Sequence, residues 1–213
     1  MLIDIKRKII FVAGLKTGST SVENMFQHMA DIRIVRSEWG KHDAVHQIKQ
    51  KFAWLFEKIP FDEFFVWGVI REPRDWLWSL YKSHRHENFA ADPRLYTGNM
   101  NFEEFLDDWC ARNFSQVIPQ HLKFEDENDN LVCDALIPFE RLEEGLKHMA
   151  VRYDAGGVVP KKLNASPVIE TDESFLAARD QIAERYARDY EIHQWAGDQF
   201  EAGVFGSSAD FQA

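Results

Sequence analysis

The sequence predicts an α/β fold in three layers, with a central, mainly parallel sheet flanked by helices. Residues 9–13 and 64–70 are short apolar runs, as expected for strands buried on both faces, and residues 131–138 are expected to form a third strand. A pattern typical of an amphipathic helix follows each run, and strands that alternate with helices favour a parallel sheet. No internal repeat, low-complexity tract or linker divides the chain, so residues 1–213 are expected to form a single domain.

The helical patterns have recognisable starts and stops. Hydroxyl side chains at 19–21 can cap the helix that follows the first apolar run. Pro60 ends the next helix, and Pro73 fits a first helical turn, where its missing N–H is tolerated. The segment 88–101 is rich in Pro, Gly and Asn and predicts a surface loop. The predicted helices cover residues 19–30, 43–58, 73 onward, 102–112, 140–153 and 172–190.

Composition narrows the classes of function. The chain of 213 residues is 45% hydrophobic with a formal net charge of −10, so it can bury a core and lacks the basic excess of a nucleic-acid-binding protein. No apolar run approaches the ~20 residues of a membrane span. Two isolated cysteines, Cys110 and Cys133, match neither a zinc pattern nor a disulfide framework and are typical of reduced core residues. We expect a cytoplasmic monomer or homodimer.

A turn suited to anions follows the first predicted strand, in the stretch FVAGLKTGSTSVENMF. The first N–H groups of a helix have no partner within the helix, and the helix dipole adds positive charge there. A glycine allows the backbone to approach a ligand closely, hydroxyls add donors and a lysine adds a full charge. The residues available to an anion are Lys16, Thr17, Gly18, Ser19, Thr20 and Ser21.

This turn differs from the phosphate loop of nucleotide kinases. That loop has the pattern G-x-x-x-x-G-K-S/T, in which the lysine follows the second glycine and the hydroxyl binds magnesium. In the stretch GLKTGST the lysine precedes the second glycine. The spacing therefore does not satisfy the kinase pattern.

A second turn of the same kind follows the second apolar run, in VIREPRDWLWSLYKSH. Arg71 lies just beyond the predicted strand and offers a planar fork suited to phosphate. Ser79 lies eight residues later on the predicted helix and can converge on the same ligand. Ligands of open α/β sheets bind at the carboxyl ends of strands, where both turns lie. Two anion sites one strand apart indicate a ligand with two separate anionic groups.

At this point the sequence resembles the sulfotransferase family that uses 3′-phosphoadenosine 5′-phosphosulfate (PAPS). FVAGLKTGSTS resembles its 5′-phosphosulfate loop, VIREPRDWLWSLY its 3′-phosphate motif, and GKHDAVHQIKQ a segment of carbohydrate-type members. The resemblance continues, in family order, through VIPQHLKF, IPFERLEEGL, KKLNASP and YARDYEIH. Two departures are Ser19, where a second glycine is usual, and Glu72, where Asn or Asp is usual before proline.

The resemblance implies a P-loop nucleoside-triphosphate-hydrolase-like fold and transfer of a sulfuryl group from PAPS to an acceptor hydroxyl, without a metal ion. A carbohydrate or glycoconjugate acceptor is favoured. Lys16 would stabilise charge on the bridging oxygen, the loop at 17–21 would hold the 5′-phosphate, and Arg71 with Ser79 would bind the 3′-phosphate. The nucleotide contacts that the resemblance implies in KKLNASP are Lys162, Asn164 and Ser166.

The general base for the attacking hydroxyl must titrate near neutrality and reach the acceptor. His42 is the candidate, because it occupies the Lys-His position of the family-like segment. Glu38 and His46 are the alternatives, with His46 four residues after His42 on the same expected helical face. Glu38, His46 and His84 are predicted to line the acceptor site.

Three other interpretations stay open. The stretch HDAVH has the histidine spacing of the zinc-protease helix H-E-x-x-H, with Asp43 in place of the glutamate, so it is a weak zinc candidate. A nucleotide or small-molecule kinase would share the fold. A non-catalytic module that binds adenosine bisphosphate would share the anion sites.

Overall fold

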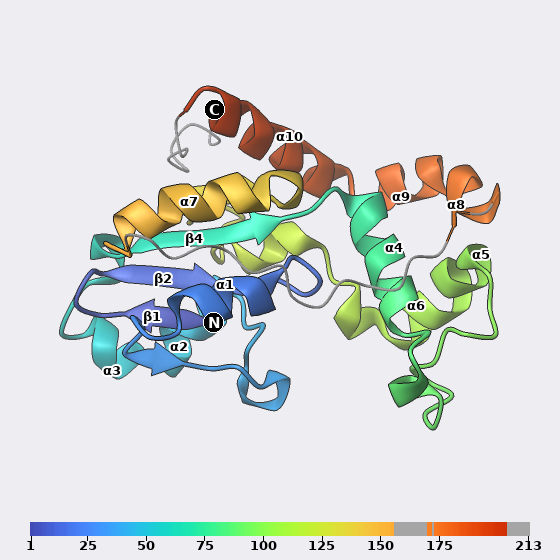
Figure 1. Cartoon of the computed structure of the whole chain (residues 1–213), viewed down its shortest axis with the longest axis horizontal. Coiled ribbons are helices and arrows are strands. Elements are labelled where there is room, and N and C mark those ends of the chain that lie inside the picture. The colour runs from blue at the N-terminus through green and yellow to red at the C-terminus, as the bar shows by residue number, and fades with distance from the viewer. Residues whose placement is uncertain (156–169, 172, 204–213) are drawn as a thin grey trace.

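A mixed five-stranded sheet forms the centre of the protein in a computed structural model that describes residues 1–155, 170–171 and 173–203. The strand order is β3-β1-β2-β4-β5. Helices cover both faces, so the prediction of an α/β fold is confirmed (Figure 1). The strands are β1 (Leu2–Asp4), β2 (Ile9–Val12), β3 (Ile32–Arg33), β4 (Phe65–Ile70) and β5 (Ala135–Pro138).

The prediction of a mainly parallel sheet is wrong. β2, β4 and β5 are parallel, but β1 runs antiparallel to both β2 and β3. The first thirteen residues form a hairpin instead of one strand, because the charged stretch between the two apolar runs makes a turn. Asp4 closes this turn by accepting hydrogen bonds from the backbone N–H and Nη1 of Arg7, both at 2.9 Å, and Lys8 adopts a φ of 55°.

The helices follow the predicted order but are shorter and more often interrupted. The expected helix at 43–58 breaks at Phe52, and that at 172–190 breaks at Ala178 and Tyr186; the side chains of all three residues are buried. A π-helical segment, Phe105–Trp109, joins α5 to α6. The helices are α1 (Ser19–Phe26), α2 (Val45–Lys51), α3 (Ala53–Phe56), α4 (Pro73–Ser83), α5 (Phe102–Glu104), α6 (Cys110–Arg112), α7 (Leu142–Arg152), α8 (Glu173–Ala177), α9 (Arg179–Arg185) and α10 (Ala187–Glu201).

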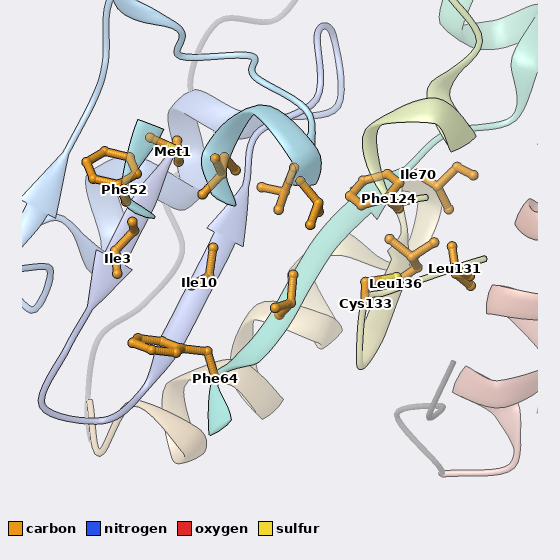
Figure 2. Packing of buried hydrophobic residues seen from close by; sticks show 14 of the residues in the cluster. Met1, Ile3, Ile10, Phe52, Phe64, Ile70, Phe124, Leu131, Cys133 and Leu136 are labelled. Carbon is orange, nitrogen blue, oxygen red and sulfur yellow. The ribbon is translucent and has the colours of Figure 1, made fainter. Parts of the chain in front are cut away.

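Alternate residues of the strands build two cores, one on each face of the sheet. Ile10 and Val66 point to the face covered by α2 and α3, where Phe64, Ile70 and Phe124 also pack (Figure 2). Phe11 and Trp67 point to the face covered by α1 and α7 and pack against Tyr153 and Phe26. The two cores fix the register of the central strands.

A third core lies beyond the carboxyl ends of the parallel strands. It is formed by α4, α5, α6, α8 and α9, called here the helical cluster, toward which the arrowheads of β2 and β4 point (Figure 1). Trp78, Phe102 and Phe105 are among its buried aromatic residues. The helical cluster therefore stands beside the edge of the sheet where both predicted anion turns lie.

Both cysteines are buried and neither forms a disulfide. Cys110 belongs to the helical cluster, where burial raises the pKa of its thiol to about 12, and Cys133 lies in the core beside β4. Each acts as a small apolar side chain, as the sequence predicted. None of the helices in the described ranges is both long enough and apolar enough to cross a membrane.

Gly68, in the middle of β4, makes room for an aromatic ring that borders the site. A Cβ atom at this position would lie 2.2 Å from Cε1 of Phe124, whose side chain is almost fully buried. The ring cannot move away without disturbing the core around Ile70 and Leu136 (Figure 2). The glycine is thus required by close packing and not by backbone conformation.

We expect Gly68→Ala to lower the free energy of unfolding by about 1–3 kcal/mol, because the added methyl group overpacks this core. Urea unfolding followed by tryptophan fluorescence would measure the change. Gly197→Ala is the matched control, since a Cβ atom there would meet nothing within 4 Å in the interior of α10. The control should stabilise the protein by about 0.5–1 kcal/mol. Equal effects at the two positions would contradict this account of Gly68.

Candidate functional site

The turn between β2 and α1 has a strained backbone held by its neighbours. Lys16 has a φ of 61° and Gly18, which precedes the first residue of α1, a φ of 75°. A positive φ is costly for lysine, and such strain persists only where surrounding contacts impose it. Here Trp76 Nε1 donates to the Leu15 carbonyl at 2.8 Å, and Arg71 Nη1 donates to the Lys16 carbonyl at 3.3 Å. The β4–α4 unit therefore shapes the β2–α1 turn.

The hydroxyl of Thr17 is the unsatisfied group of this turn. Thr17 is 1% exposed, and its Oγ1 atom has no hydrogen-bond partner among the described residues. Gly14 leaves space for it, because a Cβ atom on Gly14 would lie 2.7 Å from Oγ1. A buried hydroxyl without a partner costs about 1–3 kcal/mol. An acceptor on a bound ligand would remove that cost.

Three cationic side chains gather around the turn. Burial lowers the pKa of Lys16, and the charges of Arg71 and Lys82 lower it further. The pKa of Lys82 is likewise lowered by burial and then by Arg71. Cations that depress one another's pKa values are stabilised by an anion placed among them. The electrostatics of this edge of the sheet therefore favour an anionic ligand.

Arg71 is held rigidly at the end of β4. Its guanidinium lies over the ring of Phe139, 4.2 Å from the centroid, and its Nε atom is buried without a partner in the described structure. The side chain of Gln120 clamps its backbone: Oε1 accepts from the Arg71 N–H at 3.1 Å, and Nε2 donates to the Arg71 carbonyl at 2.8 Å. Arg71 thus keeps donor capacity on a fixed backbone.

Asp189 on α10 holds Gln120 in turn. Its fully buried carboxylate accepts from the backbone N–H groups of Gln120 and His121, both at 2.8 Å, and contacts Nδ1 of His121 at 2.7 Å. The sequence analysis assigned no role to Gln120 or Asp189, although both lie in segments that resemble the family. The role of Asp189 could have been suspected from the sequence, because it is an acidic residue between the apolar residues Tyr186 and Ile192 near the end of the predicted helix.

Glu72 stands where the resemblance in the sequence led us to expect Asn or Asp. Its side chain accepts a hydrogen bond from the Asp75 N–H at 2.7 Å and so caps α4, with Pro73 at the first helical position. The shorter Asn or Asp is the commoner cap, yet glutamate satisfies the same donor here. The change at this position leaves Arg71 in place at the end of the strand.

His42 lies before α2, so it does not share a helical face with His46 as the sequence predicted. Its Nδ1 atom is 2.9 Å from the Ala13 carbonyl, an arrangement that fits an Nδ1–H donor and leaves Nε2 as the acceptor. Burial lowers the pKa of His42 to about 4, with smaller contributions from the cations Lys123 and Lys41. Lys123 also donates to the His42 carbonyl. The imidazole is therefore neutral and oriented at physiological pH.

A cavity of about 1230 Å³ opens beside these residues at the carboxyl ends of β2 and β4. Its walls include the turn between β2 and α1, the start of α2, one face of α4 and the segment around Gln120. The predicted site residues that the structure brings together in its walls are Lys16, Thr17, His42, His46 and His84. The cavity thus joins the turn between β2 and α1 to the candidate base.

Other predicted residues lie outside the cavity wall. Ser79 is buried on α4, and Arg71 stands next to Lys16 without lining the cavity. Glu38 is exposed and pairs with Arg36 at 3.6 Å, so this structure does not place it as the alternative base. Of the loop residues, Gly18, Ser19, Thr20 and Ser21 form the start of α1 but not the wall. Lys162, Asn164 and Ser166 fall outside the described residues.

The zinc-like stretch HDAVH has a different geometry from a metalloprotease helix. His42 precedes α2 while His46 lies within it, and the carboxylate of Asp43 pairs with Lys51. In the part of the chain that the structure describes, no group of three or more His, Cys, Asp or Glu side chains is placed to hold a metal ion. The two histidines share a cavity wall instead.

The low pKa of His42 can be measured by NMR titration of the imidazole ring. We expect a value of about 4 in the free protein, below the ordinary 6.5, because burial penalises the charged ring. Lys123→Met should raise this pKa, since it removes a neighbouring positive charge. Lys49→Met, on the exposed side of α2, is the control and should leave it unchanged. A value near 6.5 in the free protein would contradict the buried, oriented imidazole.

Comparison of the chain with family profiles, curated proteins and solved structures finds no match. The functional assignment therefore depends on the motifs of the sequence and on the geometry of the site.

Proposed function

We propose that this protein is a sulfotransferase that moves the sulfuryl group of PAPS to an acceptor hydroxyl. The observation that carries the proposal is the meeting of Lys16, Arg71 and the unpartnered Thr17 hydroxyl at the ends of two neighbouring parallel strands. A donor with anionic groups at both its 5′ and 3′ positions would satisfy all three. In this role the β2–α1 turn would hold the 5′-phosphate with its backbone N–H groups, as a P-loop does.

The residues present fit such a donor. The first N–H groups of α1 and the Thr17 hydroxyl offer uncharged donors for the 5′-phosphate, and Lys16 offers a charge beside them. Arg71 presents guanidinium donors one strand away, on a backbone clamped by Gln120. Ser79 lies two turns along α4 and follows the family motif as the second 3′-phosphate residue. The fit rests on charge and donor chemistry together.

The transfer needs a base, a stabilised leaving group and in-line placement. Nε2 of His42 accepts the proton of the acceptor hydroxyl as the oxygen forms its bond to sulfur. The bond between sulfur and the bridging oxygen breaks, and Lys16 stabilises the charge that remains on the phosphate. The products are a sulfate ester and adenosine 3′,5′-bisphosphate, with the proton held on His42 until it passes to solvent.

The low pKa of His42 in the free protein bears on this role. A base with a pKa of about 4 is weak at neutral pH, where the best catalytic bases titrate close to 7. An anionic donor in the neighbouring site would raise the pKa of His42, because negative charge stabilises the imidazolium. Binding of the donor would therefore raise the pKa of His42 toward neutrality and make the imidazole a stronger base.

Donor binding can be tested with adenosine 3′,5′-bisphosphate and isothermal titration calorimetry. We expect Arg71→Ala to weaken binding about 10- to 100-fold, as for loss of a hydrogen bond between charged groups. Arg94→Ala is the control, because that side chain is 84% exposed on the loop after α4. Equal affinity of the Arg71 variant and the native protein would overturn the 3′-phosphate assignment.

Turnover can be tested with PAPS and a panel of hydroxyl acceptors. We expect Lys16→Ala to lower kcat about 100- to 1000-fold and His42→Gln about 100- to 10,000-fold. His42→Gln should leave bisphosphate affinity within about twofold, since it replaces a neutral imidazole with a neutral amide and changes no charge beside the donor site. Retained kcat in the His42 variant would move the role of base to His46. Magnesium-dependent transfer from ATP in place of PAPS would favour a kinase.

A further inference from the structure

One part of the cavity wall combines apolar side chains with a few uncharged polar ones. Between residues 76 and 118 the lining side chains come from α4, from the loop that follows it and from the segment after α6. None of them is Asp, Glu, Lys or Arg. His84 is the titratable one, and burial lowers its pKa while its Nδ1 atom contacts the Leu80 carbonyl at 3.1 Å. We call Leu80, Phe89, Leu95 and Ile118 the apolar wall, together with Leu122 from the next segment, which also contributes Lys123 to the cavity lining.

Four of the five residues of the apolar wall are exposed or half-buried in the protein as it stands, and Leu80 is buried beneath them. Ile118 and Leu122 are 41% and 40% exposed, and Phe89 and Leu95 are half-buried. All four line the cavity that also contains Lys16 and His42. Apolar side chains gathered in a concave site gain free energy when a ligand removes them from water. The residues that sequence analysis placed in a loop at 88–101 therefore supply part of a binding surface.

A sugar without an apolar part suits this wall poorly. Free sugars carry hydroxyl groups around the ring, and each hydroxyl buried against hydrocarbon without a partner costs free energy. Ser83, Ser115 and Gln116 are the polar neighbours on this side, and they offer few positions for hydrogen bonds. The wall thus complements a ligand whose far end is hydrocarbon.

An acidic rim of the cavity disfavours polyanions. Glu125, Asp126, Glu127 and Asp129 line the cavity there. The Asp126 carboxylate accepts hydrogen bonds from the N–H groups of Asn128 and Asn130, and Glu125 pairs with Arg188 at 3.5 Å. These two carboxylates therefore stabilise the loop that carries them. The rim nevertheless adds negative potential to the entrance, which repels an acceptor that already carries sulfates or carboxylates.

We infer that the acceptor is a small, uncharged amphiphile, with its reacting hydroxyl at His42 and an alkyl or aryl body against the apolar wall. The inference rests on the proposed sulfuryl transfer and specifies its acceptor. The hydroxyl oxygen of the amphiphile forms the new bond to sulfur, and the bond between sulfur and the bridging oxygen of PAPS breaks. Among glycoconjugates it selects those with an uncharged, apolar aglycone.

The test uses n-alkyl β-glucosides from methyl to hexyl, below their critical micelle concentrations, with PAPS and the full chain. We expect kcat/KM to rise about two- to fourfold for each added methylene until the wall is filled. Glucose itself should be the poorest acceptor of the series. A kcat/KM that does not depend on alkyl length would overturn the inference.

Two variants locate the effect. Leu95→Ser and Ile118→Ser should flatten the dependence on chain length, through a higher KM for the hexyl compound, and leave bisphosphate affinity unchanged. Leu176→Ser is the matched control, because Leu176 is 62% exposed on α8 and is not in the cavity wall. An unchanged chain-length series in both wall variants would overturn the assignment of the wall.

Direct calorimetric binding of methyl and hexyl glucoside separates this inference from the proposed function. Tighter binding of the hexyl compound that Ile118→Ser abolishes, without any transfer from PAPS, would support the apolar wall and contradict sulfuryl transfer. Transfer from PAPS without a preference for hexyl glucoside would support sulfuryl transfer and contradict the wall. The absence of both binding and transfer would overturn both.

Discussion

The parallel pairing of β2 with β4 is the constraint on which the site depends. It brings the ends of the two strands side by side, so that Lys16 and Arg71 meet although 55 residues separate them in the chain. The positive charges of these two side chains repel each other, and their burial adds a desolvation cost. The apolar packing on both faces of the sheet supplies the free energy that holds them there. The fold therefore stores an electrostatic cost that an anionic ligand would relieve.

Buried polar contacts transmit this order outward from the sheet. Asp189 fixes the Gln120 backbone, and Gln120 fixes the backbone of Arg71 on both its N–H and its carbonyl. Such a network is favourable only when each member is satisfied, since a lost partner leaves another group unpaired in the interior. The unsatisfied atoms beside it, Thr17 Oγ1 and Arg71 Nε, are thus informative. They mark where the internal hydrogen bonding stops and where a ligand would continue it.

The sequence predicted the secondary structure correctly where a local pattern of apolar residues determines it. Continuous apolar runs predicted β2 and β4, and the turns after them gave Lys16 and Arg71 their places at neighbouring strand ends. It failed for β1 and β3, because strands of three and two residues carry too little periodicity to recognise. The antiparallel edge of the sheet was missed for that reason.

The contents of the cavity were harder to predict than its position. His42 and His46 were expected on one helical face, yet α2 begins between them, and both still line the cavity. Glu38 was expected near them and is exposed instead. Contacts of long sequence separation, such as those of Gln120 and Asp189, leave little local trace in the chain. Apolar patterns along the chain indicate strand ends and loops, whereas contacts between distant side chains depend on the tertiary packing.

The contact of Asp189 with Gln120 has a consequence for the order of assembly. These partners are 69 residues apart, and Gln120 in turn holds Arg71, 49 residues before it. Contacts of such separation form late, because the loop between the partners must first be closed. During synthesis the anion site cannot reach its final shape until α10 has left the ribosome. A nascent chain in which the turns after β2 and β4 have already formed would still lack the Gln120–Asp189 contacts that fix Arg71.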